Sequence, residues 1–181
     1  SSGYNVLISK GPKTAGHFEF YTKDGNMYFF APDLGDYSLG FNLNTLDEGW
    51  HQLAFVWQNH SITIYADGKA VGGCSAKAAV TETVETIAFG GQTDGSMAFG
   101  GTLDTVRLYD RALTAEELVV NSKHESAYAE ATGNDIGKAQ KTDFDFSDGS
   151  TVNLWLNADT IPSDFGILIA KGTKATNRHF E

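Results

Sequence analysis

Two aspartates near the end of the chain have a spacing that would suit paired-acid chemistry. Asp143 and Asp145 alternate with Phe144 and Phe146, so a strand here would carry both carboxylates on one face and both rings on the other. Glycosidases need two carboxyl groups about 5–10 Å apart. Because no longer run of alternating acids accompanies this pair, the sequence favours a solvated or cation-binding pair over a catalytic one.

Asp104 is a third candidate acid. It lies in a predicted strand over residues 102–109, where it shares parity with Val106 and Leu108, so we expect its side chain to point toward the core near the strand end. A carboxylate in such a place needs backbone N–H donors or a cation, because burying an unpaired charge is costly. The residues alone leave both alternatives open.

Two predicted loops, at residues 32–37 and 90–96, together contain acids, an amide and an aromatic ring. These are the side chains that usually bind hydroxyl-rich ligands. The second loop is rich in glycine, but it lacks the Gly-Lys-Ser/Thr ending of a phosphate-binding loop and no helix follows it. We therefore expect a ligand site at a rim of the fold. Its candidate residues are Asp33, Asp36, Tyr37, Gln92 and Asp94.

Large aromatic side chains recur in the predicted strands, at Trp50, Phe55, Trp57 and Trp155. Aromatic residues in strands mostly fill cores, and that is the expectation here. Any ring that faced outward could instead stack on a sugar. The five histidines show neither metal-ligand spacing nor a partner that would make a catalytic base.

Charge and composition exclude several classes of function. Asp and Glu number 23 against 13 Lys and Arg, for a net charge of −10, which repels nucleic acid and anionic lipid. No apolar run is long enough to insert into a membrane. The single cysteine, Cys74, excludes an intramolecular disulfide. The first residues do not resemble a signal peptide, so an export signal is expected to lie outside this sequence.

The chain repeats part of itself. Residues 6–13 (VLISKGPK) reappear as residues 167–174 (ILIAKGTK), and residues 17–19 (HFE) reappear as residues 179–181. The first match has an offset of 161 residues, and the second follows after a slip of one residue. Such self-similarity at a nearly constant offset is the signature of a tandem repeat. The sequence is therefore predicted to span about one repeat and the start of the next.

Alternating apolar and polar residues, separated by turn dipeptides such as Asp24-Gly25 and Asp67-Gly68, predict an all-β chain. One short helix is predicted over residues 114–123, with Thr114 and Glu117 as a capping box. The strands are expected at residues 4–9, 16–22, 26–31, 37–43, 50–58, 61–66, 69–73, 83–89, 98–101, 102–109, 142–147, 150–157 and 165–170.

Two stretches carry a family resemblance. Residues 49–57 (GWHQLAFVW) lead into residues 62–69 (ITIYADGK), and residues 99–117 read FGGTLDTVRLYDRALTAEE. Together they resemble the laminin-G-like domains of the concanavalin-A-like superfamily. The resemblance implies a two-sheet antiparallel jelly-roll sandwich with one short helix. It also implies a structural Ca²⁺ beside Asp104, with Asp143 and Asp145 as further ligands.

The repeat and the resemblance together predict three regions. Residues 1–125 would form a laminin-G-like sandwich that lacks its opening strands, residues 126–141 would connect two copies, and residues 142–181 would be the opening strands of the next copy. A sandwich does not tolerate missing interior strands. We therefore expect residues 142–157 to complete the fold, either by folding back as in a circular permutant or by a domain swap between molecules.

The predicted function is a non-catalytic extracellular binding module, which recognises glycans or a glycosylated surface partner within a tandem array of an exported protein. Repetition favours this function because several weak sites on one chain gain avidity. The alternative is a structural spacer or adhesion repeat without sugar binding. A glycoside hydrolase of the same fold is a more distant alternative.

Overall fold

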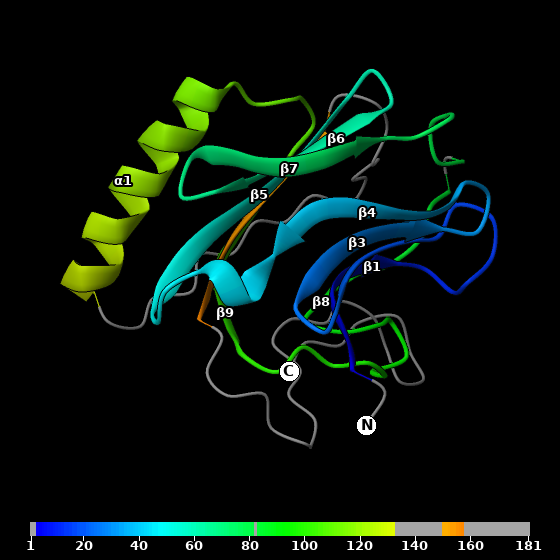
Figure 1. Cartoon of the computed structure of the whole chain (residues 1–181), viewed down its shortest axis with the longest axis horizontal. Coiled ribbons are helices and arrows are strands. Elements are labelled where there is room, and N and C mark those ends of the chain that lie inside the picture. Colours follow the sequence, from blue (N-terminus) through cyan, green and yellow to red (C-terminus); the bar gives the residue numbers. More distant parts are fainter. Residues whose placement is uncertain (1–2, 82, 133–149, 158–181) are drawn as a thin grey trace.

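A computed structural model describes residues 3–81, 83–132 and 150–157, with only the backbone given for residues 124–132, 150 and 157. Its strands form two five-stranded antiparallel sheets, sheet A in the order β4-β3-β2-β1-β8 and sheet B in the order β7-β6-β5-β10-β9 (Figure 1). The strands are β1 (Tyr4–Lys10), β2 (Phe18–Lys23), β3 (Asn26–Ala31), β4 (Gly35–Asn42), β5 (Trp50–Gln58), β6 (Ser61–Ala66), β7 (Lys69–Ser75), β8 (Ile87–Phe89), β9 (Thr102–Tyr109) and β10 (Ser150–Asn157). A 3₁₀ turn, η1 (Leu43–Thr45), follows β4. The predicted all-β sandwich is confirmed.

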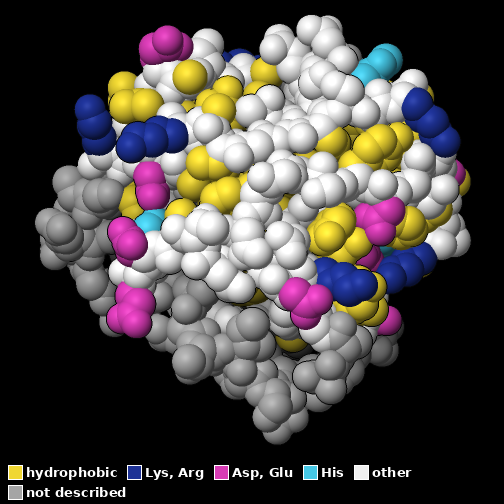
Figure 2. Space-filling model, viewed as in Figure 1, with side chains coloured by type: hydrophobic (Ala, Val, Ile, Leu, Met, Phe, Trp, Pro, Cys, Tyr) yellow, Lys and Arg dark blue, Asp and Glu magenta, His cyan; other side chains and the backbone are white. Residues whose placement is uncertain are grey.

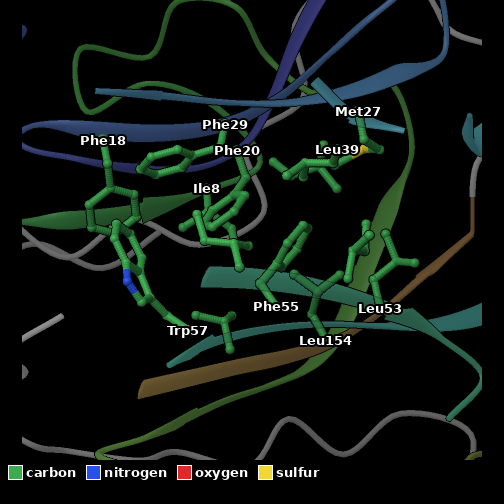
Figure 3. Packing of buried hydrophobic residues seen from close by; sticks show 14 of the residues in the cluster. Ile8, Phe18, Phe20, Met27, Phe29, Leu39, Leu53, Phe55, Trp57 and Leu154 are labelled. Carbon is green, nitrogen blue, oxygen red and sulfur yellow. The ribbon is translucent and has the colours of Figure 1, made fainter. Parts of the chain in front are cut away.

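The two sheets pack face to face through the apolar side chains of every second residue. Phe18, Phe20 and Phe29 of sheet A point toward Phe55 and Trp57 of sheet B (Figure 3). The rings of Phe20 and Phe55 lie 4.2 Å apart, centroid to centroid, and so join the sheets at the centre of the core. The alternation read from the sequence thus corresponds to one buried face of each sheet.

β10 lies inside sheet B, although it follows the other strands of that sheet by more than forty residues. It pairs with β5 on one side and with β9 on the other. Val152, Leu154 and Leu156 point into the core, and none of them is more than 1% exposed. In this structure the strand comes from the same chain. The division of the chain into repeats remains a prediction.

Four predicted strands differ from the structure or lie outside the described residues. The strand expected at 83–89 is reduced to β8, because Val84 is 96% exposed and residues 83–86 offer no apolar face. The strand expected at 98–101 is wrong: only an isolated bridge joins Ala98 to Val6. The strands expected at 142–147 and 165–170 lie outside the described residues.

The helix α1 (Ala115–Thr132) runs nine residues beyond the predicted end at 123. Residues 124–132 include several alanines and glutamates, which are good helix formers, and no proline or glycine. The first part of the predicted connection over residues 126–141 is therefore helical. The helix packs against sheet B, where Leu113 and Leu118 cover Ala54 and Val56.

The predicted capping box is confirmed. Glu117 accepts a hydrogen bond from the backbone N–H of Thr114 at 2.9 Å, and the Thr114 hydroxyl accepts one from the N–H of Glu117 at 3.2 Å. Arg111 adds a bidentate ion pair to the same carboxylate. The hydrogen bonds from Arg111, followed by the one from Thr114, lower the pKa of Glu117 to about 2.

These contacts predict a pH dependence of the helix. Because the pKa of Glu117 is lower in the folded chain than its ordinary 4.5, its contribution to stability is complete above pH 4.5 and is lost as the pH falls toward 2. Thermal unfolding between pH 5 and pH 2 should show a smaller loss of Tm for Glu117→Gln than for the wild type. Glu116→Gln is the control, and an equal loss of Tm in the wild type and in Glu117→Gln would contradict this role.

Figure 2 shows the face of the molecule seen in Figure 1. Its hydrophobic side chains lie in several separate patches among polar atoms, and charged side chains lie mostly around the margin. Among the described residues, no helix is both long and apolar enough to cross a membrane.

Candidate functional site

The outer face of sheet A carries a regular array of mostly polar and aromatic side chains. The registers of β1 to β4 place these residues in three rows across the sheet. Because side chains alternate along a strand, their neighbours Phe18, Phe20 and Phe29 point the other way, into the core. The rows are Ser9, Glu19, Phe30 and Asp36; then Val6, Tyr21, Tyr28 and Ser38; and then Tyr4, Lys23, Asn26 and Asn42.

Three tyrosines, which we call the tyrosine row, lie next to one another on this face. The rings of Tyr21 and Tyr28 stack at 5.2 Å with an interplanar angle of 12°. Tyr4 lies 5.7 Å from Tyr21, and the amine of Lys23 lies 5.2 Å from the centroid of the Tyr4 ring. Tyr4 is 36% exposed and Tyr28 is partly exposed, whereas Tyr21 between them is buried. The row is thus an aromatic surface with a cation at one end.

An acid fixes the central tyrosine. The Tyr21 hydroxyl donates to both carboxylate oxygens of Asp36, at 3.0 and 2.8 Å. Burial, and then the hydrogen bond to Asp36, raise the pKa of the Tyr21 phenol. Asp36 itself is exposed, so its remaining lone pairs face solvent beside the aromatic surface.

A second acid on this face, Glu19, is buried under polar neighbours. One of its oxygens, Oε1, accepts a hydrogen bond from the Gln92 amide, and it lies 3.0 Å from His17 Nε2 and 3.5 Å from Lys13 Nζ. The other ring nitrogen of His17 lies 2.9 Å from the carbonyl of Gly11. This cluster connects the loop that contains Gln92 to the start of β2. The loop is therefore fixed at the border of the outer face.

Asp94 and Ser96 shape the tip of that loop. Asp94 Oδ1 accepts hydrogen bonds from the N–H of Ser96 at 2.9 Å and from its hydroxyl at 2.6 Å. The bonds from the Ser96 hydroxyl, and then from its N–H, hold the pKa of Asp94 below its ordinary value. The Ser96 hydroxyl also lies 2.8 Å from Gln92 Oε1. The loop thus presents an ionised carboxylate in a fixed position.

The five predicted ligand residues do not gather at one point. Asp36 lies on the outer face of sheet A, and Gln92 and Asp94 lie in the loop beside it. Asp33 instead accepts hydrogen bonds from the Thr81 hydroxyl at 2.8 Å and from the N–H of Gly16 at 3.3 Å. Tyr37 follows Asp36 on β4 and faces the opposite side of the sheet, where it packs against the core.

The expected orientation of Asp104 is wrong. Asp104 pairs with Trp155 on the outer face of sheet B, because the ladder between β9 and β10 shifts register at this point. Thr105 has a φ of 46°, which places an extra residue in the strand and reverses the alternation. Leu103 on one side of the irregularity and Val106 on the other both face the core.

The described residues do not by themselves form the expected calcium site. Asp104 Oδ1 accepts hydrogen bonds from the N–H of Thr105 at 2.6 Å and from its hydroxyl at 3.2 Å. No three His, Cys, Asp or Glu side chains cluster around a metal position within the described ranges. The other predicted ligands, Asp143 and Asp145, lie outside those ranges.

The tryptophans divide between the core and the outer surface. Phe55 and Trp57 fill the core as predicted, but Trp50 is 41% exposed at the start of β5. Trp155 is buried on the outer side of sheet B. The sequence reasoning missed the tyrosine row. The signal was present, since the hairpin turn at Asp24-Gly25 places Tyr21 opposite Tyr28.

Two buried amides lie on the outer side of sheet B. Among the described residues, neither the Gln52 side chain nor the Asn153 side chain has a hydrogen-bond partner, and both are fully buried. Burying an unpaired amide costs about 1–3 kcal/mol. Nothing in the described structure explains why these two positions are polar.

This cost predicts a stabilising substitution. Asn153→Leu removes the unpaired amide at similar volume and should raise the free energy of unfolding by about 1–2 kcal/mol. Urea unfolding monitored by circular dichroism would measure the change, with Asn153→Asp as the matched variant that should lower stability. A loss of stability in Asn153→Leu would contradict the assignment and would indicate a polar partner for this amide.

Comparison with known proteins adds one match. A laminin G family model, described as covering the concanavalin A-like lectin/glucanases superfamily, matches residues 1–119. No curated protein and no solved structure is significantly similar to the chain.

Proposed function

Because the chain belongs to the concanavalin A-like lectin/glucanases superfamily, we propose that it is a non-catalytic glycan-binding module and that the outer face of sheet A is its binding surface. Membership of the superfamily supports a lectin-like or adhesion module in general terms. The choice of a glycan ligand depends on this chain's own residues.

The observation that carries the proposal is the tyrosine row beside a fixed acid. A pyranose ring has an apolar C–H face, which packs on an aromatic ring, and hydroxyl groups, which need donors and acceptors at the edge. Tyr4 and Tyr28 offer the aromatic surface, and Asp36 offers acceptors beside it. Asn26 and Asn42, joined by a hydrogen bond of 3.1 Å, add amides in the next row.

The loop at the border of the face supports the same assignment. Gln92 and Asp94 are held in place by Glu19 and Ser96, so little ordering would be required when a ligand binds. Three of the five residues predicted from the sequence, Asp36, Gln92 and Asp94, are retained as ligand residues. Asp33 and Tyr37 are better explained as structural residues.

The environment of the acids favours binding over hydrolysis. A glycosidase needs one carboxyl group that acts as an acid and another that acts as a nucleophile or base. On this face, Glu19 is only 3% exposed and three polar groups surround one of its oxygens, and Asp36 accepts the Tyr21 hydroxyl with both oxygens. Neither acid is arranged as a free nucleophile.

The family supports an extracellular setting for the module. Laminin-G-like domains are typically extracellular, and the net charge of −10 suits an exported protein. We therefore propose an extracellular or cell-surface location. We propose that ligand binding to the outer face of sheet A does not require calcium, because its acids and amides are already fixed by protein contacts.

Affinity gel electrophoresis against a panel of neutral and acidic polysaccharides would test the proposal. The wild-type chain should be retarded by at least one polysaccharide, and the retardation should persist with EDTA. The spacer alternative predicts free migration on every gel. Retardation that EDTA abolishes would instead assign binding to a calcium site and not to the tyrosine row.

A further inference from the structure

The position of β10 within sheet B has a defined shape and chemistry. β5 and β9 both use this strand as their neighbour, so without it two rows of backbone donors and acceptors would be unpaired. The core would also lose the side chains of Val152, Leu154 and Leu156. The position therefore accepts one strand of defined register and alternation.

The sequence around β10 predicts that the strand belongs to a second repeat. Residues 167–174 resemble residues 6–13, which include most of β1, so a second β1-like segment follows β10 after nine residues. In sheet A, β1 already lies between β2 and β8. A second β1-like segment could enter that sheet only by displacing the first.

We propose that the β10 position is an exchangeable strand site, which β10 from a second copy of this chain can fill. Residues 133–149 separate α1 from β10, and seventeen residues span up to about 60 Å when extended. The connection is therefore long enough for β10 to reach the sheet of a neighbouring molecule. This inference does not depend on the proposed function.

Two forms are compared: a closed form, in which β10 pairs within its own chain, and an exchanged form, in which β10 pairs with a second copy. Both forms use the same strand pairs. Each β10 would meet the same faces of β5 and β9 in either form, so the two forms differ only in the connection and in the entropy of association. Mass action then decides between them. Exchange increases with chain concentration during refolding, and two sandwiches joined in this way present two copies of the face of sheet A.

Cysteines placed at one strand pair test the exchange directly. Asn153 of β10 lies opposite Ala54 of β5. In a Cys74→Ser background, one chain carries Ala54→Cys and another carries Asn153→Cys, and the two chains are unfolded, mixed and refolded under oxidising conditions. A disulfide between the two chains can form at this pair only if β10 of one chain lies beside β5 of the other.

We expect a linked dimer on non-reducing gels, with a dimer-to-monomer ratio that rises about tenfold for each tenfold increase in chain concentration. Gln58→Cys replaces Ala54→Cys in the control mixture, because that position lies about 13 Å farther along β5, and this mixture should give little dimer. The double variant Ala54→Cys/Asn153→Cys should form this disulfide within one chain at low concentration.

Two results would overturn the proposal. In the first, the double variant forms the disulfide within one chain, but the mixture gives no linked dimer at any concentration. This result shows that β10 does not exchange. In the second, the double variant fails to close, which shows that β10 does not pair with β5 in the register used here. Neither result bears on glycan binding, which the polysaccharide gels measure separately.

Discussion

Replacing Phe55 with alanine is expected to lower the free energy of unfolding by about 3–5 kcal/mol. Phe55 is 1% exposed, and its ring lies 4.2 Å from that of Phe20 on the opposite sheet. The substitution leaves a cavity where the two sheets meet, and neighbouring strands held by ladders on both sides have little freedom to close it. Urea unfolding would measure the loss.

A surface substitution gives the matched control for Phe55→Ala. Val84 is 96% exposed, so Val84→Ala should change the free energy of unfolding by less than about 0.5 kcal/mol. If Phe55→Ala had an equally small effect, the two sheets would not share the core described here.

Replacing Tyr28 with alanine is expected to weaken glycan binding by about 5–30-fold, which corresponds to about 1–2 kcal/mol. Tyr28 is the partly exposed ring that stacks on Tyr21 at 5.2 Å. Its loss removes a ring from the aromatic surface and exposes the buried Tyr21. Isothermal titration calorimetry with the polysaccharide selected on the gels would measure the affinity.

Tyr37→Phe is the control for Tyr28→Ala. Tyr37 lies on the opposite side of β4, where its hydroxyl donates to the carbonyl of Leu34 at 3.3 Å. Loss of this hydroxyl should leave the affinity unchanged. A large effect of Tyr37→Phe with none of Tyr28→Ala would place the binding surface away from the tyrosine row and near the loop that contains Asp33.

Local sequence patterns were sufficient to predict most of the strands and the hairpins that join them, whereas the arrangement in two sheets was implied by the family resemblance. The Asp24-Gly25 and Asp67-Gly68 turns fix the hairpins β2-β3 and β6-β7, and the alternation around them identifies the buried rings. The N-terminus of α1 was also predictable, since the capping box uses residues only three apart. Each of these features depends on short-range geometry.

The orientation of Asp104 was not predictable in the same way. Simple alternation holds only for a regular strand, and the irregularity at Thr105 lies in the ladder between β9 and β10, a strand more than forty residues away. The end of α1 was also missed. Residues 124–132 are mostly small or polar, which is typical of a connection, but the alanines and glutamates among them also favour a helix.

The candidate site was predictable in part. Asp36, Gln92 and Asp94 have the chemistry of a ligand site, but their sequence positions do not show which side of the sheet they border. Asp33 shares that chemistry, but its carboxylate already accepts hydrogen bonds from Thr81 and Gly16. The pairing of Tyr21 with Tyr28 could be predicted from the Asp24-Gly25 hairpin, but the place of Tyr4 in the tyrosine row depends on the register of β1 against β2.

The most direct test of the central claim is a titration of the ¹⁵N-labelled chain with an oligosaccharide from the polysaccharide selected on the gels, followed by NMR. We predict that the perturbed backbone amides cluster on β1 to β4 around Tyr4, Tyr28 and Asp36, and in the loop that contains Gln92 and Asp94. Perturbations confined to sheet B or to the rim around Asp33, or none with any oligosaccharide of the panel, would contradict the account.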